Sequence, residues 1–399
     1  MSRIAWVGND RQLYAASLNG GPTLALTRPP PAGLGSWGTS PRAPEVWSWP
    51  TWSPDGRWIA AFSVESTDDR VGPVRVDTIG LDGVQQEVWW EGPGVSPIYL
   101  QWRPQGDALS ILLQRDEELV LGVIRRQEVG RMREVETGVP LFFNWTPDGS
   151  RLLLHVGQRG EKGGRIVLRD PLGPAEDVLF PQDAGSFCAP VFANGRAVYA
   201  VAGESHSEVL ASTISGERPH KLDDGPGLYA LVGGPGKVPL VAMSRSSRQE
   251  GSPYQGIDVA DVRTGKVRRL TDLGLFAFSW SPCGTWILGA QVAAAENCLR
   301  WWKIPLSGEA IELGTFWPSR DMLFYLHFFD QYTTSHSLIS PDGRWITFAG
   351  YPAGEGHKDL SSPPRIYVKD TTAPDSAPSE VGTGVFAVWE RGGIGSDPA

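Results

Sequence analysis

One short motif recurs along the chain and constrains the fold more than any other feature. Each copy has an apolar or aromatic anchor residue, a tight polar turn that ends in Gly, and a hydrophobic run. The five clearest copies read Trp52-SPDG-RWIAAFS, Trp102-RPQG-DALSILL, Trp145-TPDG-SRLLLHV, Trp280-SPCG-TWILGA and Ile339-SPDG-RWITFAG. Weaker copies have their anchors at Val191, Val232 and Trp389. Successive anchors lie 50, 43, 46, 41, 48, 59 and 50 residues apart, and such a period indicates a repeat architecture.

Each copy predicts a small antiparallel sheet. The Pro-Asp-Gly turn suits a tight connection, so it joins two short strands into a hairpin. Hydrophobic segments such as 165–170 and 256–262 supply a third strand, and residues 267–271 supply a fourth. Four antiparallel strands in a unit of 40–50 residues form the blade of a β-propeller.

The two ends of the sequence predict how the ring closes. Residues 1–28 read as the second, third and fourth strands of a blade, and residues 382–392 read as a first strand. Together they complete one blade, which leaves no open sheet edge. The sequence therefore predicts an all-β fold: one propeller domain over 1–399 with eight four-stranded blades. The count is seven if the weak copy at Val232 is misread.

The repeat also resembles that of a known family. The sequence WSPDGRWIAAFS, followed by strands like those at 366–368 and 267–271, is similar to the TolB-type propeller repeat, which also builds the propeller of the prolyl-oligopeptidase family. The resemblance covers nearly the full length. It implies a bacterial protein that binds other proteins, beside a membrane complex in the case of TolB. Peptidase activity is not expected, because no G-x-S-x-G occurs and no residues remain for a hydrolase domain.

Long connections predict which face of the ring binds. They fall between blades, at 29–45 and 314–332, and between second and third strands, at 65–73, 244–255 and 351–364. In a meandering blade both classes emerge on the same face. Long loops on a rigid scaffold are where binding residues usually lie.

Two groups of residues on that face are candidates. The polar segment 330–337 leads into an innermost strand. Its residues Asp330, Tyr332 and His336, together with the nearby His327, are of the types that support acid–base chemistry or metal binding. The alternative is that they only pack inside the ring. Eight of the 17 tryptophans occupy two fixed positions of the repeat, and we assign these eight to packing between blades. Trp37, Trp47 and Trp317 fall outside those two positions. If exposed, these three favour a protein, peptide or carbohydrate partner; otherwise they fix loops to the ring. The candidate residues are Trp37, Trp47, Trp317, Asp330, Gln331, Tyr332 and His336.

Composition narrows the function further. The net charge of −9 disfavours nucleic-acid binding, which needs a basic surface. No apolar run is long enough to span a bilayer, and no signal peptide is visible, so a cytoplasmic location is expected, with an exported or periplasmic one as the alternative. No cofactor is expected, although Asp68-Asp69 or residues 116–118 offer carboxylates to calcium.

These observations predict a binding module that contacts a protein or small ligand through its loop-rich face. The alternative is an enzyme, a metal-assisted hydrolase or lyase, with its site around Asp330, Tyr332 and His336. A third interpretation is a sugar-binding module, which requires Trp37, Trp47 or Trp317 to be exposed.

Overall fold

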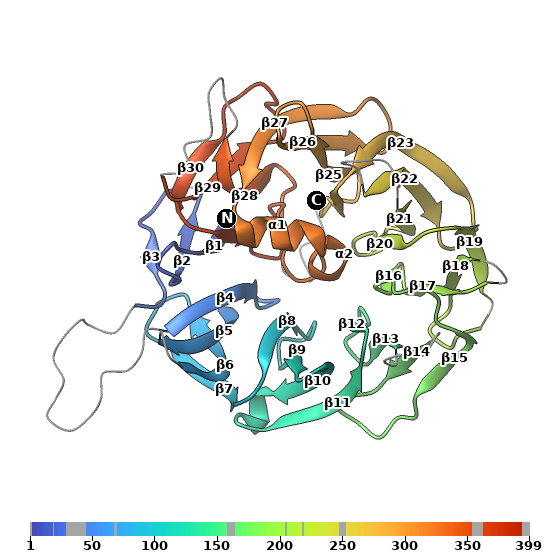
Figure 1. Cartoon of the computed structure of the whole chain (residues 1–399), viewed down its shortest axis with the longest axis horizontal. Coiled ribbons are helices and arrows are strands. Elements are labelled where there is room, and N and C mark those ends of the chain that lie inside the picture. Colours follow the sequence, from blue (N-terminus) through green and yellow to red (C-terminus); the bar gives the residue numbers. More distant parts are fainter. Residues whose placement is uncertain are drawn as a thin grey trace, which may run out of the picture.

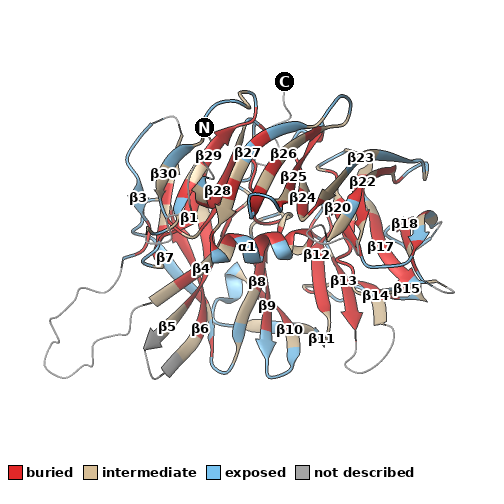
Figure 2. Ribbon diagram, turned by 45° about the horizontal axis from the view of Figure 1, so that its top comes forward, coloured by how far each residue is buried: buried red, intermediate tan, exposed pale blue. Residues whose placement is uncertain are grey.

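Antiparallel sheets form a ring around a common centre (Figure 1). The computed structural model describes residues 2–18, 20–28, 45–67, 70–157, 164–203, 206–217, 219–246, 253–352 and 362–392. Buried residues follow the strands, whereas exposed residues concentrate at turns and outer edges (Figure 2). Within the described ranges, no helix is both long and apolar enough to cross a bilayer.

Six of the sheets among the described residues have four strands each. The first pairs β31 (Phe386–Trp389), β1 (Arg3–Val7), β2 (Leu13–Ser17) and β3 (Leu24–Ala25). The next two comprise β4 (Glu45–Trp52), β5 (Trp58–Thr67), β6 (Arg70–Gly80) and β7 (Gln86–Gly92), then β8 (Ser96–Trp102), β9 (Ala108–Arg115), β10 (Glu118–Arg125) and β11 (Met132–Gly138). The following sheet comprises β12 (Leu141–Trp145), β13 (Leu152–Gly157), β14 (Gly164–Arg169) and β15 (Val178–Asp183). The last two comprise β16 (Val191–Ala193), β17 (Arg196–Ala202), β18 (Ser207–Ser212) and β19 (His220–Gly225), then β20 (Tyr229–Gly233), β21 (Leu240–Arg245), β22 (Tyr254–Asp261) and β23 (Val267–Leu275).

A further sheet joins seven strands. They are β24 (Ala277–Trp280), β25 (Trp286–Ala293), β26 (Cys298–Pro305), β27 (Ile311–Pro318), β28 (Trp345–Pro352), β29 (Arg365–Asp370) and β30 (Ser379–Thr383). The last residues of β27 pair with the end of β28, which connects two groups of strands that the repeat predicts as separate blades. Residues 337–339, predicted as an innermost strand, make only isolated bridges to Trp389 and Ile346. The count of eight blades stays a prediction.

Strands from the two ends of the sequence close the ring, as predicted. Strand β1 pairs with β31 in antiparallel register, with Ile4 opposite Trp389 and Val7 opposite Phe386. Beside this ladder, the Arg3 side chain donates to the Glu390 carboxylate from Nε (2.7 Å), and the Glu390 backbone N–H donates to the Arg3 carbonyl (2.9 Å). The closing sheet thus has its predicted strand order.

The repeated turn is stabilised by its own side chains. In the first copy, Asp55 accepts hydrogen bonds from the Ser53 hydroxyl (2.6 Å) and the Arg57 backbone N–H (3.0 Å). The Ser53 hydroxyl in turn accepts from the backbone N–H of Trp58 (2.9 Å). Gly56 has φ of 66°, a conformation that favours glycine. These contacts explain why Ser, Asp and Gly recur at fixed places in the motif.

The anchor tryptophans connect neighbouring sheets. All five are buried. The indole Nε1 of Trp102 donates to the Thr51 carbonyl oxygen on the inner strand of the preceding sheet (3.1 Å). Trp52 and Trp280 make equivalent bonds to Val388 (3.4 Å) and Val232 (2.9 Å). Each bond joins two sheets, so these buried anchor tryptophans are packing residues, as the repeat predicted.

Candidate functional site

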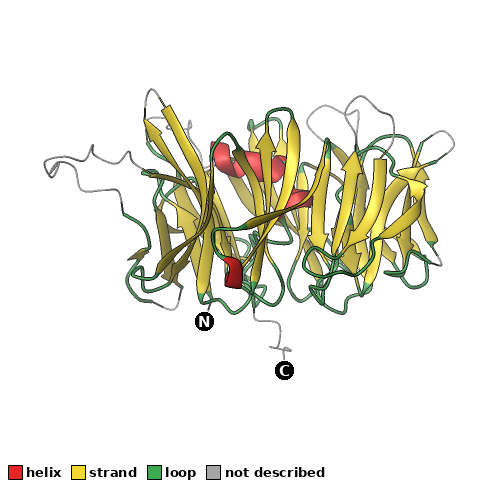
Figure 3. Cartoon of the chain, turned by 90° about the horizontal axis from the view of Figure 1, so that it is seen from below, coloured by secondary structure: helices red, strands yellow, loops and turns green. Residues whose placement is uncertain are grey.

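Two short helices occupy the centre of the ring. Helix α1 (Arg320–His327) and helix α2 (Phe329–Tyr332) follow β27 and lie across the middle of the ring in Figure 1. Helix α1 is displaced toward one face of the ring, which we call the helix face (Figure 3). The opposite face, which carries the tight turns and the short 3-10 helix η1 (Arg126–Glu128), is the turn face. The long connection predicted at 314–332 is therefore largely β27 and helix rather than loop.

Helix α1 has one buried side and one exposed side. Ser319 caps its first turn, because the hydroxyl accepts a hydrogen bond from the Met322 backbone N–H (3.0 Å). Met322, Tyr325 and Leu326 are buried against the ring, at the spacing of one helical face. Leu323 and Phe324, on the other side, stay 44% and 43% exposed. The helix face thus presents apolar side chains near its centre.

The predicted polar segment forms part of a buried aromatic cluster. Tyr332 and His336 pack with Tyr99, Trp49 and Phe386, with ring centres 4.7–6.2 Å apart. The Tyr332 hydroxyl donates to the Ile98 carbonyl (2.6 Å). Since this hydroxyl is buried and already paired, its contribution is to hold α2 against β8.

His336 is also fully paired inside the protein. Its Nε2 lies 3.4 Å from the Trp49 carbonyl, which only accepts, so Nε2 carries the proton. Its Nδ1 then accepts from the Ser335 hydroxyl (2.6 Å). Burial lowers the pKa of His336 to about 3, so the ring is neutral at pH 7.

Asp330 differs from these neighbours because its carboxyl group is buried without a cation. No ion pair to it occurs within the described ranges. Burial raises the pKa of Asp330 from 3.8 to about 7, although backbone N–H groups at the start of α2 lower it in part. Burial also raises the pKa of Cys188 and of Tyr254, and the charge of Asp330 adds to both shifts. Tyr254 itself packs against Phe329 of α2, with ring centres 5.7 Å apart.

Trp49 has an unusual backbone conformation. Strand β4 contains an irregularity, since Ser48 pairs with Phe62 while Thr51 pairs with Ala60, which leaves one extra residue on β4. Trp49 lies within this bulge at φ of 54°, a region that bulky residues rarely adopt. The bulge places its ring against Phe324 of α1 (5.5 Å) and Phe386 of β31 (5.0 Å).

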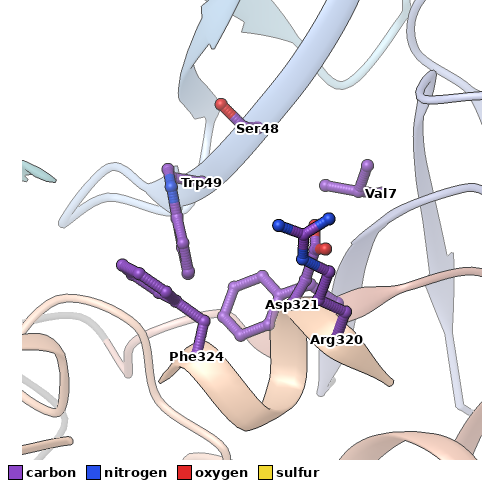
Figure 4. Close-up of a pocket in the computed structure, with 7 residues that line it drawn as sticks. Val7, Ser48, Trp49, Arg320, Asp321 and Phe324 are labelled. Atoms are coloured by element: carbon purple, nitrogen blue, oxygen red, sulfur yellow. The ribbon is translucent and has the colours of Figure 1, made fainter. Parts of the chain in front are cut away.

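A pocket opens on the helix face beside this ring. Its volume is about 220 Å³. We call it the Trp49 pocket, and its lining residues are Val7, Ser48, Trp49, Arg320, Asp321, Phe324 and Phe386. Figure 4 shows Trp49 and Phe324 on one side, Val7 on the other, and the Arg320 guanidinium reaching up from α1 between them. The walls are mostly apolar, and the charged groups come from the first turn of α1.

The structure changes the interpretation of the tryptophans predicted to bind. Trp37 lies outside the described residues. Trp47 is not in a connection: it lies in β4, which spans Glu45–Trp52, and its side chain is buried. Trp317 is also in a strand, β27, where it is half-buried and its Nε1 donates to the Asn297 carbonyl (2.9 Å). Neither position provides the exposed ring that the sugar-binding interpretation requires.

The remaining predicted residues are close together but mostly enclosed. Asp330, Gln331, Tyr332 and His336 all belong to the α2 region at the ring centre, and Gln331 is half-buried. Of the carboxylates proposed for calcium, Asp116 and Glu117 lie in the turn between β9 and β10 and Glu118 begins β10, while Asp68-Asp69 lies outside the described residues. Among the described side chains, no group of three or more His, Cys, Asp or Glu residues is arranged to hold a metal ion.

Sequence reasoning missed the pocket itself. Val7, Trp49 and Phe324 come from three distant segments, and only ring closure and the placement of α1 bring them together. One signal was present: Met322, Tyr325, Leu326 and Phe329 recur at helical spacing within the segment treated as a loop.

Comparisons with known proteins support the architecture. No protein-family model and no curated protein matches the sequence. Among solved structures, the β-propeller domain of the trilobed protease from Pyrococcus furiosus has a TM-score of 0.53 at 10% identity, over 84% of this chain and 97% of that one. The fold is a β-propeller. A eukaryotic initiation factor also matches, with a TM-score of 0.53 at 13% identity, over 98% and 99% of the two chains.

Two further similarities relate to the families that the repeat resembles. Prolyl oligopeptidase B from Galerina marginata has a TM-score of 0.54 at 12% identity, and the match covers 85% of this chain and 51% of that one. TolB from Acinetobacter baumannii matches at 16% identity over 84% of each chain, with a TM-score of 0.41 that adds no weight to the assignment. At these identities the likeness extends to the fold alone, and the site has to be argued from its own residues.

Proposed function

We propose that this propeller is a binding module whose partner docks on the helix face, over α1 and the Trp49 pocket. The observation that carries the proposal is the presence of two exposed apolar side chains, Leu323 and Phe324, beside an apolar pocket. Apolar side chains next to a pocket are typical of the energetic centre of a protein interface. The strained backbone of Trp49 supports the proposal, because such strain concentrates at functional sites.

The enzyme alternative has one observation in its favour. The pKa of Asp330, at about 7, falls in the range that suits a general acid or base at neutral pH. However, the Tyr332 hydroxyl and both ring nitrogens of His336 hydrogen-bond within the protein. Two of the three proposed catalytic groups are therefore already engaged in hydrogen bonds inside the protein, so we keep binding as the main proposal.

Introducing a negative charge into the apolar face tests this placement. Leu323→Glu puts a carboxylate at the centre of the helix face, whereas Val84→Glu puts one at an 83% exposed position in the turn between β6 and β7, on the turn face. We expect proteins crosslinked to the wild-type chain in its host cells to be lost from Leu323→Glu and retained by Val84→Glu. If both variants retain them at wild-type levels, the partner docks elsewhere.

A further inference from the structure

The size of the Trp49 pocket limits what it holds. An apolar cavity of about 150 Å³ accommodates one benzene ring, whereas sites for drug-sized ligands span roughly 300–1,000 Å³. At about 220 Å³, the pocket has room for one aromatic ring and little more. A single inserted side chain fits this space, while a large cofactor does not.

The walls suit an aromatic ring in particular. Trp49 and Phe324 are tilted by 45°, and Trp49 and Phe386 by 66°, so each presents a face or an edge rather than forming a closed stack. Aromatic rings prefer such offset and edge-to-face neighbours. Because the β4 bulge and the underlying rings fix Trp49, the pocket exists before anything binds.

The charges at the rim indicate a second requirement. Asp321 is already in an ion pair with Arg11, with an N–O distance of 2.5 Å. Arg320 is exposed, and within the described ranges no hydrogen bond or ion pair involves its guanidinium. The pocket rim therefore has one uncompensated positive charge on a protein whose net charge is −9. A planar guanidinium favours a carboxylate as its partner.

We infer that the Trp49 pocket binds an aromatic side chain of a partner protein that has a carboxylate side chain next to it in sequence. This inference rests on the proposed function and names the anchor that the helix face recognises. The ring enters between Trp49, Phe324 and Val7, and the carboxylate pairs with Arg320 at the rim. Exposed Leu323, one helical position from Phe324, extends the contact surface beyond the pocket and favours a protein segment over a free small molecule.

Short peptides test the anchor directly. The probes are Ac-Gly-Trp-Asp-Gly-amide, its Asn counterpart without the charge, and its Ala counterpart without the ring, with indole-3-acetate as the free small molecule. Binding to the full chain is followed by saturation-transfer NMR on the probe. We expect the Trp-Asp peptide to bind, the Trp-Asn peptide to bind about fivefold more weakly, and the Ala-Asp peptide not to bind detectably.

Protein variants locate the binding. Arg320→Gln should make the Trp-Asp and Trp-Asn peptides bind equally, and since Arg320 is exposed this variant should fold normally. Phe324→Ala should weaken both Trp peptides about tenfold, because it removes one wall. Ile214→Ala, at a similarly exposed apolar position on the turn face, is the matched control and should leave binding unchanged.

The outcomes separate this inference from the broader proposal. If no Trp peptide binds while Leu323→Glu still loses its crosslinked partner, the helix face is the docking surface and the aromatic anchor is wrong. If Arg320→Gln leaves the fivefold preference intact, the assignment of the carboxylate is wrong. Binding of indole-3-acetate as tight as that of the Trp-Asp peptide overturns the choice of a protein segment.

Discussion

Asp330→Asn should make the protein more stable at high pH and change how its stability depends on pH. Burial raises the pKa of Asp330 to about 7, whereas in the unfolded chain this carboxyl group has its ordinary pKa of 3.8. Between these values the folded state holds a proton that the unfolded state releases, so raising the pH favours unfolding. The gap of about three pH units corresponds to about 4 kcal/mol, since each unit is worth about 1.4 kcal/mol.

Two buried histidines act in the opposite direction. Burial lowers the pKa of His155 to about 4 and that of His336 to about 3, so both favour folding as the pH rises toward 6.5. The pH profile of the wild type therefore mixes opposing contributions. The difference between wild type and Asp330→Asn isolates the carboxyl group, because both histidines are present in both proteins.

Urea unfolding at pH 5 and pH 8 measures that difference. From the lower to the higher pH, the free energy of unfolding of Asp330→Asn should rise relative to wild type by about 3 kcal/mol. Any cost of burying the amide is independent of pH and cancels. Asp272→Asn, which removes a carboxylate that is 92% exposed, controls for the change in charge. A difference that stays constant between the two pH values refutes the reasoning.

Two further predictions concern other parts of the ring. Asp77 is completely buried and binds Arg75 (2.7 Å) and the Ser63 hydroxyl (2.8 Å), so Asp77→Ala should lower the free energy of unfolding by about 3 kcal/mol, against about 1 kcal/mol for Ser63→Ala. Urea titration of both variants checks this, and equal losses would contradict it. The third prediction concerns the cysteines. Residue Cys283 is exposed. Partial desolvation raises the pKa of its thiol, but hydrogen bonds with Ser281 and Thr285 outweigh that effect, so the pKa is lowered overall. Cys188 and Cys298 are buried, and burial raises the pKa of both thiols. Iodoacetamide at pH 7 should therefore add one group to the folded protein, at Cys283, and mass spectrometry showing a different first site would count against this.

Local features of the fold were predictable because they depend on contacts within one repeat. The Ser53–Asp55–Gly56 turn is stabilised by its own neighbours, so its sequence reports its structure directly. The anchor tryptophans were predictable for a related reason, since the same sheet-to-sheet contact recurs around the ring.

The centre of the ring was not predictable in the same way. Helix α1 has eight residues, which is too short to be stable alone, and it depends on the buried contacts of Met322, Tyr325 and Leu326. The bulge at Trp49 depends on the pairing between β4 and β5. The burial of Asp330 depends on how α2 packs, so the sequence identified the residue but not the cause of its raised pKa.

The pairing of β1 with β31 has a consequence for how the protein is made. Because Ile4 lies opposite Trp389, the closing sheet cannot form until translation has passed the last of its strands. Strand β1 is synthesised long before that point, and until then one of its edges has unpaired backbone groups that are prone to pair with other chains. Such a distant contact also makes closure slow. A product truncated before residue 386 would keep this edge permanently open, so the final residues of the ring protect the chain from aggregation.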